Sequence, residues 1–208
     1  MQIPIPDKVK LELKAGEVDI NGPLGKLTQR LPGGITLKIE GANAVVTTTD
    51  VDNVAGGPLH GLARTLVANA IAGVTKGFKK ELEIVGLGYR ASANRFPDPD
   101  GKRGTPAKRG FISNAAKEKV YFQIGFAHDI EFHLPAGVKV AIDGKQTFLT
   151  ITGTDAYLVG EVAAQIRRLK PPEPYKGTGI KYAGEHIIRK AGKTAAGAVG
   201  GGAGGGKK

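Results

Sequence analysis

The sequence predicts an α+β protein made of two duplicated small domains, each an antiparallel sheet covered on one face by one helix. Two observations predict this fold class. LPGGITLKIEG (31–41) aligns with LPAGVKVAIDG (134–144) at an offset of 103 residues, and apolar residues alternate with polar or small ones in both copies. A helical pattern then follows each copy, beginning near His60 and near Asp155.

The first copy is expected to contain strands before the LP motif, a strand pair around its Glu-Gly turn, and then a helix. The helix, expected at 60–74, places Leu62, Leu66, Ala70 and Val74 on one face. DNVAGGP (52–58) is expected to be a loop that the second copy lacks, and Lys76–Lys80 to join the two domains. The expected strands are VKLEL (9–13), EVDIN (17–21), KLTQR (26–30) and the segments around 35–39 and 44–49.

The second copy repeats this order, and its helix is expected at 155–169 with Asp155 as the N-cap. One face of that helix carries Leu158, Val162, Ile166 and Leu169. The expected strands are ELEIVGLGYRA (81–91), KVYFQIGF (119–126), DIEFH (129–133) and the segments around 138–142 and 147–152.

Two further segments lie outside this repeat. Three prolines and four glycines break any regular period within 168–193, so this basic segment is expected to be extended and to pack poorly. The Gly/Ala run after it is typical of a flexible tail. The predicted parts are an N-terminal domain (1–81), a C-terminal domain (82–170) with an insertion at about 92–119, the extended segment (171–193) and the tail (194–208).

The charge is distributed unevenly and indicates a polyanionic partner. The formal net charge is +11; residues 1–82 carry ten basic and eight acidic residues, and residues 83–208 carry twenty and eleven. Nucleic acid is the commonest polyanion that such a chain binds. Within 165–208 there are ten Lys or Arg residues and two Glu. A merely soluble basic surface is the alternative, and the uneven distribution argues against it.

The sequence offers no catalytic constellation, so we expect no enzyme, cofactor, metal or small-molecule substrate. Cysteine is absent, which excludes disulfides, thiolate metal sites and cysteine catalysis. The histidines have no metal-ligand spacing. Gly86-Leu87-Gly88 lies in a strand pattern and opens no helix, unlike a nucleotide-binding loop. No apolar run approaches the ~20 residues that span a bilayer, and the first residues do not form a signal peptide, so no membrane partner is expected.

Aromatic and basic residues alternate in the C-terminal segment. Tyr175 precedes Lys176, and Tyr182 follows Lys181. This pattern suits an RNA interface in which lysines contact phosphates and rings stack on bases or sugars. The alternative is that both rings pack on their own domain, and the sequence leaves both interpretations open.

Several separated motifs resemble one known family. PPEPYKGTGIKY (171–182), HGLARTLVANAIAGVTKGFKKELEIVGLGYRA (60–91), GFAHDIEFHLP (125–135) and LVGEVAAQIRRLKPP (158–172) are similar, in the same order, to the sixth protein of the large ribosomal subunit in its bacterial form. The resemblance covers roughly 5–92 and 118–193. It implies the duplicated α+β fold and a structural, non-enzymatic protein of the ribosome in the cytoplasm.

The resemblance also implies a binding site. Family members bind large-subunit (23S) rRNA near the sarcin–ricin loop and the stalk base, supporting assembly and the region where translation factors dock. Expected partners are this rRNA and neighbouring ribosomal proteins near the stalk base, and no homo-oligomer is expected. Binding is attributed mainly to the second domain and its extension, which implies rRNA contacts by Lys170, Tyr175, Lys176, Gly177, Lys181, Tyr182, Arg189 and Lys190.

This chain departs from the family pattern at three places. Thr178 stands where a basic residue usually follows YKG, and the basic leader before the IPIP stretch is nearly absent. The third departure is the long 92–119 insertion, which is either a tolerated solvent loop or a second rRNA contact. Phe96 and Phe111 favour the contact, whose basic residues would be Arg95, Lys102, Arg103, Lys108 and Arg109.

Two other function classes remain as alternatives. A free-standing RNA-binding chaperone or regulator is compatible with a basic two-domain chain. An enzyme acting on RNA would need an acid–base or metal cluster, which the sequence does not offer.

Overall fold

The computed structural model describes residues 2–14, 16–41, 43–48, 56–94, 115–116 and 119–193. The chain divides into two compact units. The first is formed by residues 1–80, 134–140 and 150–162, and the second by residues 81–133, 141–149 and 163–208. The predicted domain boundaries at 81 and 170 stay predictions.

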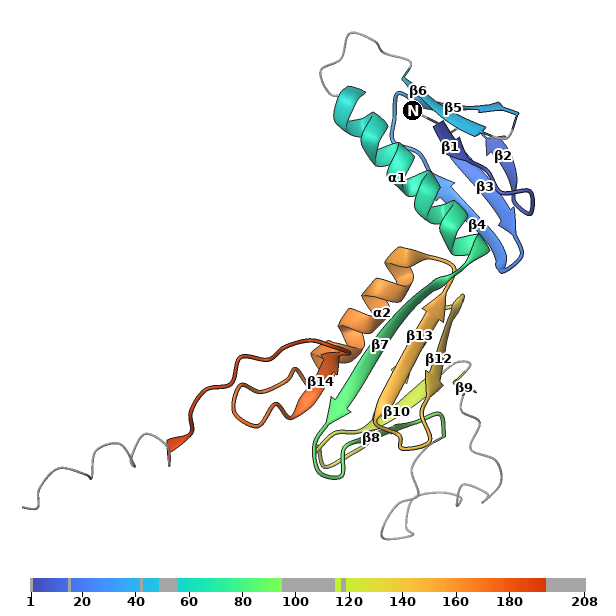
Figure 1. Cartoon of the computed structure of the whole chain (residues 1–208). Helices are drawn as coiled ribbons and strands as arrows, with labels where there is room; N and C mark the ends of the chain where they lie inside the picture. The colour runs from blue at the N-terminus through green and yellow to red at the C-terminus, as the bar shows by residue number, and fades with distance from the viewer. Residues whose placement is uncertain are drawn as a thin grey trace, which may run out of the picture. The chain divides into compact units, whose positions relative to one another are not determined.

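The N-terminal repeat contains two small antiparallel sheets and one long helix (Figure 1). Helix α1 (Gly56–Thr75) contacts strands of both sheets, so one helix covers the two. The strand orders are β1-β6-β5 and β2-β3-β4. The strands are β1 (Gln2–Pro4), β2 (Lys10–Lys14), β3 (Glu17–Gly22), β4 (Gly25–Arg30), β5 (Ile35–Glu40) and β6 (Asn43–Thr48).

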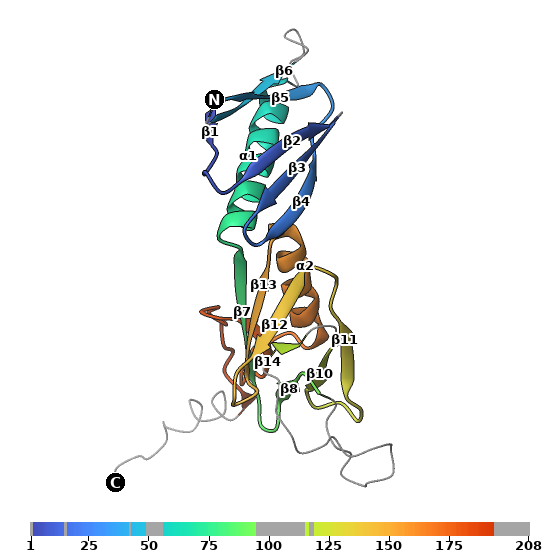
Figure 2. The same cartoon turned by 90° about the vertical axis from the view of Figure 1, so that its right-hand side faces the viewer.

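The C-terminal repeat also contains two sheets, in the orders β14-β7-β13-β12-β9 and β11-β10-β8. Helix α2 (Ala156–Leu169) follows β13, as α1 follows β6 (Figures 1 and 2). The strands are β7 (Phe78–Val85), β8 (Arg90–Ser92), β9 (Ala115–Ala116), β10 (Lys119–Gln123), β11 (Ile130–His133), β12 (Val138–Ile142), β13 (Phe148–Gly153) and β14 (Gly179–Tyr182).

The sheet topology repeats as the sequence does. The order β1-β6-β5 has its counterpart in β7-β13-β12, and β2-β3-β4 has its counterpart in β8-β10-β11. The α+β fold class with duplicated domains is therefore confirmed, with two sheets per repeat rather than one. Strands joined by short hairpins pair with each other, whereas β1 and β7 each pair with a strand from further away in the chain. Among the described strands, β9 and β14 have no counterpart in the first repeat.

The core of the first unit lies between α1 and its sheets. In α1, Ala70 and Val74 are buried as predicted, whereas Leu62 is exposed and Ala63 and Val67 are buried instead. In α2, Val162 and Ile166 are buried as predicted. The clustered core residues are Ile3, Val9, Val18, Ile20, Ile35, Leu37, Ala44, Val46, Ala63, Val67, Ala70, Ile71 and Val74.

Several local predictions need correction. Gly86–Gly88 does not lie inside a strand: both glycines have positive φ, and they form the turn between β7 and β8. The segment predicted to join the domains already contains the start of β7 at Phe78, and α1 begins at Gly56, inside the predicted loop. The N-cap is confirmed, since the backbone N–H of Tyr157 donates to Asp155 Oδ1 at 2.8 Å.

The expectation that 171–193 packs poorly is wrong for its central part. Residues Gly179–Tyr182 form β14 at the edge of the five-stranded sheet, and Ile180 is fully buried. The sequence did not predict this strand, because it is only four residues long and lies among prolines and glycines.

Candidate RNA interface

The segment after α2 turns back tightly to reach the sheet. The backbone N–H of Ile180 donates to the carbonyl of Lys170 at 2.8 Å, and that of Glu173 donates to the carbonyl of Thr178 at 3.0 Å. The loop closes closely at Gly179, where an added Cβ would lie 2.6 Å from the carbonyl oxygen of Pro171. Only glycine fits there, so the return of the chain depends on this residue.

Strand β14 then pairs antiparallel with β7, with Ile180 opposite Ile84 and Lys181 opposite Glu83. The Lys181 ammonium lies 3.0 Å from Glu83 Oε2. The pairing and the burial of Ile180 fix the backbone of the segment on the second unit. The chain beyond β14 therefore starts from a fixed strand.

A bidentate ion pair fixes the chain just beyond β14. Arg167, on α2, donates from Nε to Glu185 Oε2 at 3.1 Å and from Nη2 to Oε1 at 2.5 Å. Glu185 Oε2 also accepts from the backbone N–H of Tyr182 at 2.9 Å. The bond from Arg167 is the main cause that lowers the pKa of Glu185, and the same bond raises the pKa of Arg167. The pair ties the segment to the helix that precedes it.

Beyond the Arg167–Glu185 ion pair the chain runs back alongside residues 174–177. The backbone N–H of Lys190 donates to the carbonyl of Pro174 at 2.8 Å. The guanidinium of Arg189 lies close to Gly177, where an added Cβ would be 3.5 Å from Nη2. These contacts gather four exposed residues that we call the basic patch: Tyr175, Lys176, Arg189 and Lys190.

The other predicted contact residues have structural partners. Lys170 is half-buried, with its ammonium 5.0 Å from the ring centre of Phe126. Tyr182 is half-buried under Arg167, whose Cζ lies 5.7 Å from the ring centre. Gly177 is buried, and Lys181 forms its ion pair. The sequence left open whether the two tyrosines pack on the protein or face a partner. In the structure they differ: Tyr182 packs on its own unit, and Tyr175 is 56% exposed.

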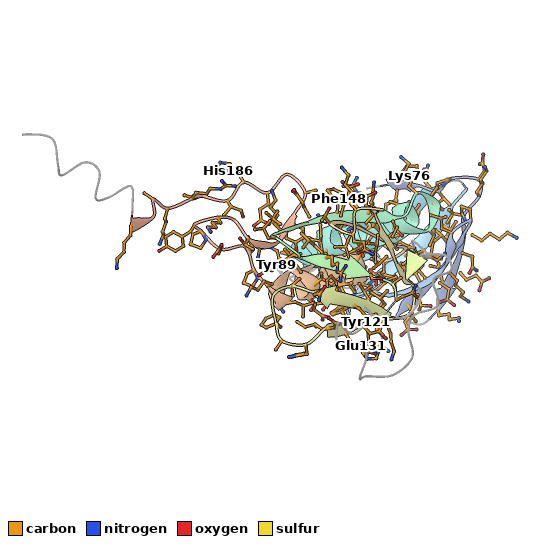
Figure 3. The ribbon with its side chains drawn as sticks, turned by 90° about the horizontal axis from the view of Figure 1, so that it is seen from below. Lys76, Tyr89, Tyr121, Glu131, Phe148 and His186 are labelled. Carbon is orange, nitrogen blue, oxygen red and sulfur yellow. The ribbon has the colours of Figure 1, made fainter. Side chains whose placement is uncertain are left out.

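Some relevant residues were not found from sequence. Arg167 and Glu185 position the patch, but nothing in the sequence pairs two opposite charges from a helix and a loop. Ile188 is 81% exposed beside Arg189, and His186 is exposed on the same stretch (Figure 3). The insertion residues Arg95, Lys102, Arg103, Lys108 and Arg109 lie outside the described residues.

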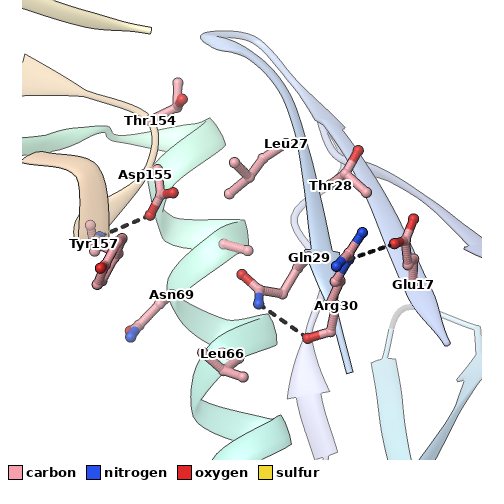
Figure 4. A pocket seen from close by; sticks show the side chains of 12 residues that line it. Glu17, Leu27, Thr28, Gln29, Arg30, Leu66, Asn69, Thr154, Asp155 and Tyr157 are labelled. Carbon is pink, nitrogen blue, oxygen red and sulfur yellow. Dashed lines mark hydrogen bonds and ion pairs between the residues drawn. The ribbon is translucent and has the colours of Figure 1, made fainter. Parts of the chain in front are cut away.

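One pocket of the first unit has the character of a structural surface. A pocket of about 700 Å³ in the first unit is lined by residues of β4, α1 and the start of α2 (Figure 4). Its charged groups are engaged: Arg30 binds Glu17 at 2.9 Å, and Asp155 caps α2. Among the described residues, no three His, Asp or Glu side chains could together hold a metal ion. No described helix is long and apolar enough to cross a membrane.

Comparison with known proteins matches large parts of both repeats. The family model described as ribosomal protein L6 matches residues 5–77 and 114–183. The chain belongs to the ribosomal protein L6 family. It is 43% identical to the large ribosomal subunit protein uL6 of Koribacter versatilis, covering 93% of this chain and 95% of that protein. It is 43% identical to the uL6 protein of Geobacter sulfurreducens, with 92% and 94% covered.

Family membership confirms the resemblance drawn from the motifs. The L6 family consists of structural ribosomal proteins and not of enzymes, so the chain is a structural constituent of the large ribosomal subunit. The family model ends at residue 183 and skips 78–113. The match therefore includes β14 and Tyr175–Lys181 but neither the insertion up to residue 113 nor Arg189 and Lys190.

Proposed function

We propose that this L6-family protein binds large-subunit rRNA through the basic patch, near the sarcin–ricin loop and the stalk base, and so supports assembly and the docking region of translation factors. The observation that carries the proposal is the convergence of Lys176, Arg189 and Lys190 beside the exposed Tyr175. Three cations can contact successive phosphates, and the ring offers a stacking surface for a base or sugar.

The proposal assigns different roles to the eight predicted residues. Lys176, Arg189, Lys190 and Tyr175 contact RNA directly. Lys181, Tyr182 and Gly177 hold the platform, because they are paired or buried within the second unit. Lys170 also belongs to the platform, because its carbonyl accepts from Ile180 and its ammonium lies over the ring of Phe126. A preformed platform lowers the ordering cost of binding, which favours a fixed structural contact.

The proposed partners are rRNA and neighbouring ribosomal proteins near the stalk base, in cytoplasmic ribosomes. The insertion residues are proposed as an additional rRNA contact. A free-standing RNA chaperone is the alternative, and it predicts comparable affinity for unrelated RNAs and a stable pool of protein off the ribosome. Sucrose-gradient fractionation after a salt wash distinguishes the two: the ribosomal assignment predicts co-sedimentation with large subunits.

Neutralising the basic patch should remove most of the specific affinity. The triple variant Lys176→Gln/Arg189→Gln/Lys190→Gln loses three phosphate contacts. The slope of log affinity against log salt concentration should therefore become shallower by about two to three. The measurement is titration of a large-subunit rRNA fragment that contains the sarcin–ricin loop, at several salt concentrations.

The matched control carries the same charge change elsewhere. Lys8, Lys10 and Lys38 are exposed on the first unit, whereas the patch belongs to the second. Their replacement by Gln should leave the slope nearly unchanged. Equal losses in both triple variants would mean that net charge, rather than the patch, determines binding, and the proposal would be withdrawn.

A further inference from the structure

A second basic surface lies on the first unit, apart from the extension. An open pocket of about 560 Å³ is formed by the β3–β4 turn, the junction between α1 and β7, and the ends of β12 and β13. Four lysines line it, and none of the described lining residues is acidic. Those lysines are Lys26, Lys76, Lys79 and Lys139.

The lysines converge from three different parts of the sequence, so their convergence is created by the fold. Lys76 follows the last turn of α1 (Figure 3), and Lys139 is an outward-facing residue of β12 between the buried Val138 and Val140. Lys26 lies on β4, where its ammonium is 3.5 Å from Asp19 Oδ2. Lys76, Lys79 and Lys139 are all exposed. The like charges of Lys76 and Lys139 repel one another, and a bound anion relieves that repulsion.

The rest of the lining favours a nucleic-acid backbone. Gly25, Gly77, Gly137 and Gly153 contribute no side chains, so a phosphate–sugar chain can approach the protein backbone closely. Thr154 adds a hydroxyl group to the lining, and the hydroxyl of Thr152 donates to the carbonyl of Lys139 at 3.4 Å. Leu24 and Phe78 add apolar surface to the lining, so the preference for a polyanion over a small apolar ligand rests on the four lysines.

We infer that this lysine pocket is a second RNA-binding site, which grips a phosphate backbone with Lys76 and Lys139 as its principal contacts. The inference rests on the proposed function, since it adds a contact to the same rRNA from the other unit. Lys26 has a structural partner in Asp19, and the site does not require it to be free. Two contact points on separate units would restrain the protein on RNA more than either alone.

The test is the full-length double variant Lys76→Gln, Lys139→Gln, compared with Lys8→Gln, Lys38→Gln. Both remove two exposed lysines of the first unit. Loss of two phosphate contacts should make the salt slope shallower by roughly 1.4–1.8, so the affinity ratio to wild type should change roughly tenfold between 50 and 200 mM salt. The control should follow the wild type. Identical behaviour of both double variants would overturn the inference.

A directional probe distinguishes the site from a general charge effect. The chain has no cysteine, so Thr152→Cys introduces a unique thiol for an iron–EDTA cleavage reagent. Cleavage of rRNA should occur from position 152 and be absent from Thr36→Cys, which is exposed on β5. Absence of cleavage from 152 in a protein that still binds rRNA refutes the lysine pocket alone. Failure of the wild type to bind rRNA refutes the proposed function. Protection of the pocket by inorganic phosphate with no RNA cleavage would make it a small-anion site.

Discussion

At the scale of single residues, the most constrained polar group is Asp19 on β3. Its side chain is 3% exposed; Lys14 Nζ lies 2.6 Å from Oδ2, and the Thr28 hydroxyl donates to Oδ1 at 2.6 Å. Both neighbours stabilise the carboxylate, so the bond from Lys14 and then that from Thr28 lower the pKa of Asp19 from 3.8 to about 2. One carboxylate therefore links the three strands β2, β3 and β4.

This shift predicts a pH-dependent stability. A lowered folded-state pKa contributes stability that is present above pH 3.8 and is lost as pH falls through about 2. Asp19→Asn should therefore be less stable than wild type at pH 6, and the difference should shrink as pH approaches 2. Urea unfolding followed by circular dichroism measures it, with Asp7→Asn in an exposed turn as control. A difference that stays constant between pH 6 and pH 2 would contradict the assignment.

At this scale, the sequence predicted which types of residue contact RNA better than it predicted where those residues lie in the structure. Charge and aromatic context point to Lys176, and the resemblance to the family implies Arg189 and Lys190, but the sequence could not place Arg189 against Gly177. That proximity depends on a backbone hydrogen bond between Lys190 and Pro174, and on Glu185 held by α2. Lys181 and Tyr182 resemble the same kind of contact residue in sequence, but the fold gives them partners: Glu83 on β7 for Lys181 and Arg167 on α2 for Tyr182.

At the scale of elements, β14 is the feature that converts a basic segment into a fixed platform. Its attachment depends on backbone pairing with β7 and on the burial of Ile180. Deletion of 171–208 would therefore remove a strand as well as an RNA contact, so binding lost after such a deletion cannot be assigned to RNA contacts alone. Point substitutions separate the two effects.

Ile180→Ala should reduce the free energy of unfolding by about 2–5 kcal/mol, because it leaves a cavity in a buried position. Ile188→Ala removes the same atoms from an 81% exposed side chain and should change it by less than about 0.5 kcal/mol. Chemical denaturation monitored by circular dichroism compares the two. Equal effects would mean that β14 does not contribute to the folded sheet.

The repeated elements were predictable because duplication shows each strand and helix twice, in patterns about five to fifteen residues long. The elements without a counterpart were not. β14 is four residues long and begins with a glycine, and its partner β7 lies far earlier in the chain. β1 has a counterpart in β7 but was also not predicted, because Pro4, which is tolerated at a sheet edge, does not resemble a strand in sequence.

At the scale of the whole molecule, the net charge of +11 sets the long-range attraction to RNA. If about six to ten phosphates are neutralised, the affinity of the purified protein for rRNA should fall by roughly 10³–10⁵ between 50 and 200 mM salt. Filter binding across that range measures the slope. A nearly flat response would mean that base contacts, rather than phosphates, dominate recognition.

The position of β14 also affects the protein while it is being made. β7 is a central strand only because β14 covers its outer edge, and β14 is the last described strand of the chain. Until residue 182 has been synthesised, the eight-residue edge of β7 has no partner on that side, and an open edge is a template for aggregation. The charged residues Lys79, Lys80, Glu81 and Glu83 lie along this strand, which is how natural sequences protect such edges from pairing with another copy. These charges therefore protect the edge of β7 in the nascent chain until β14 has been synthesised and can pair with it.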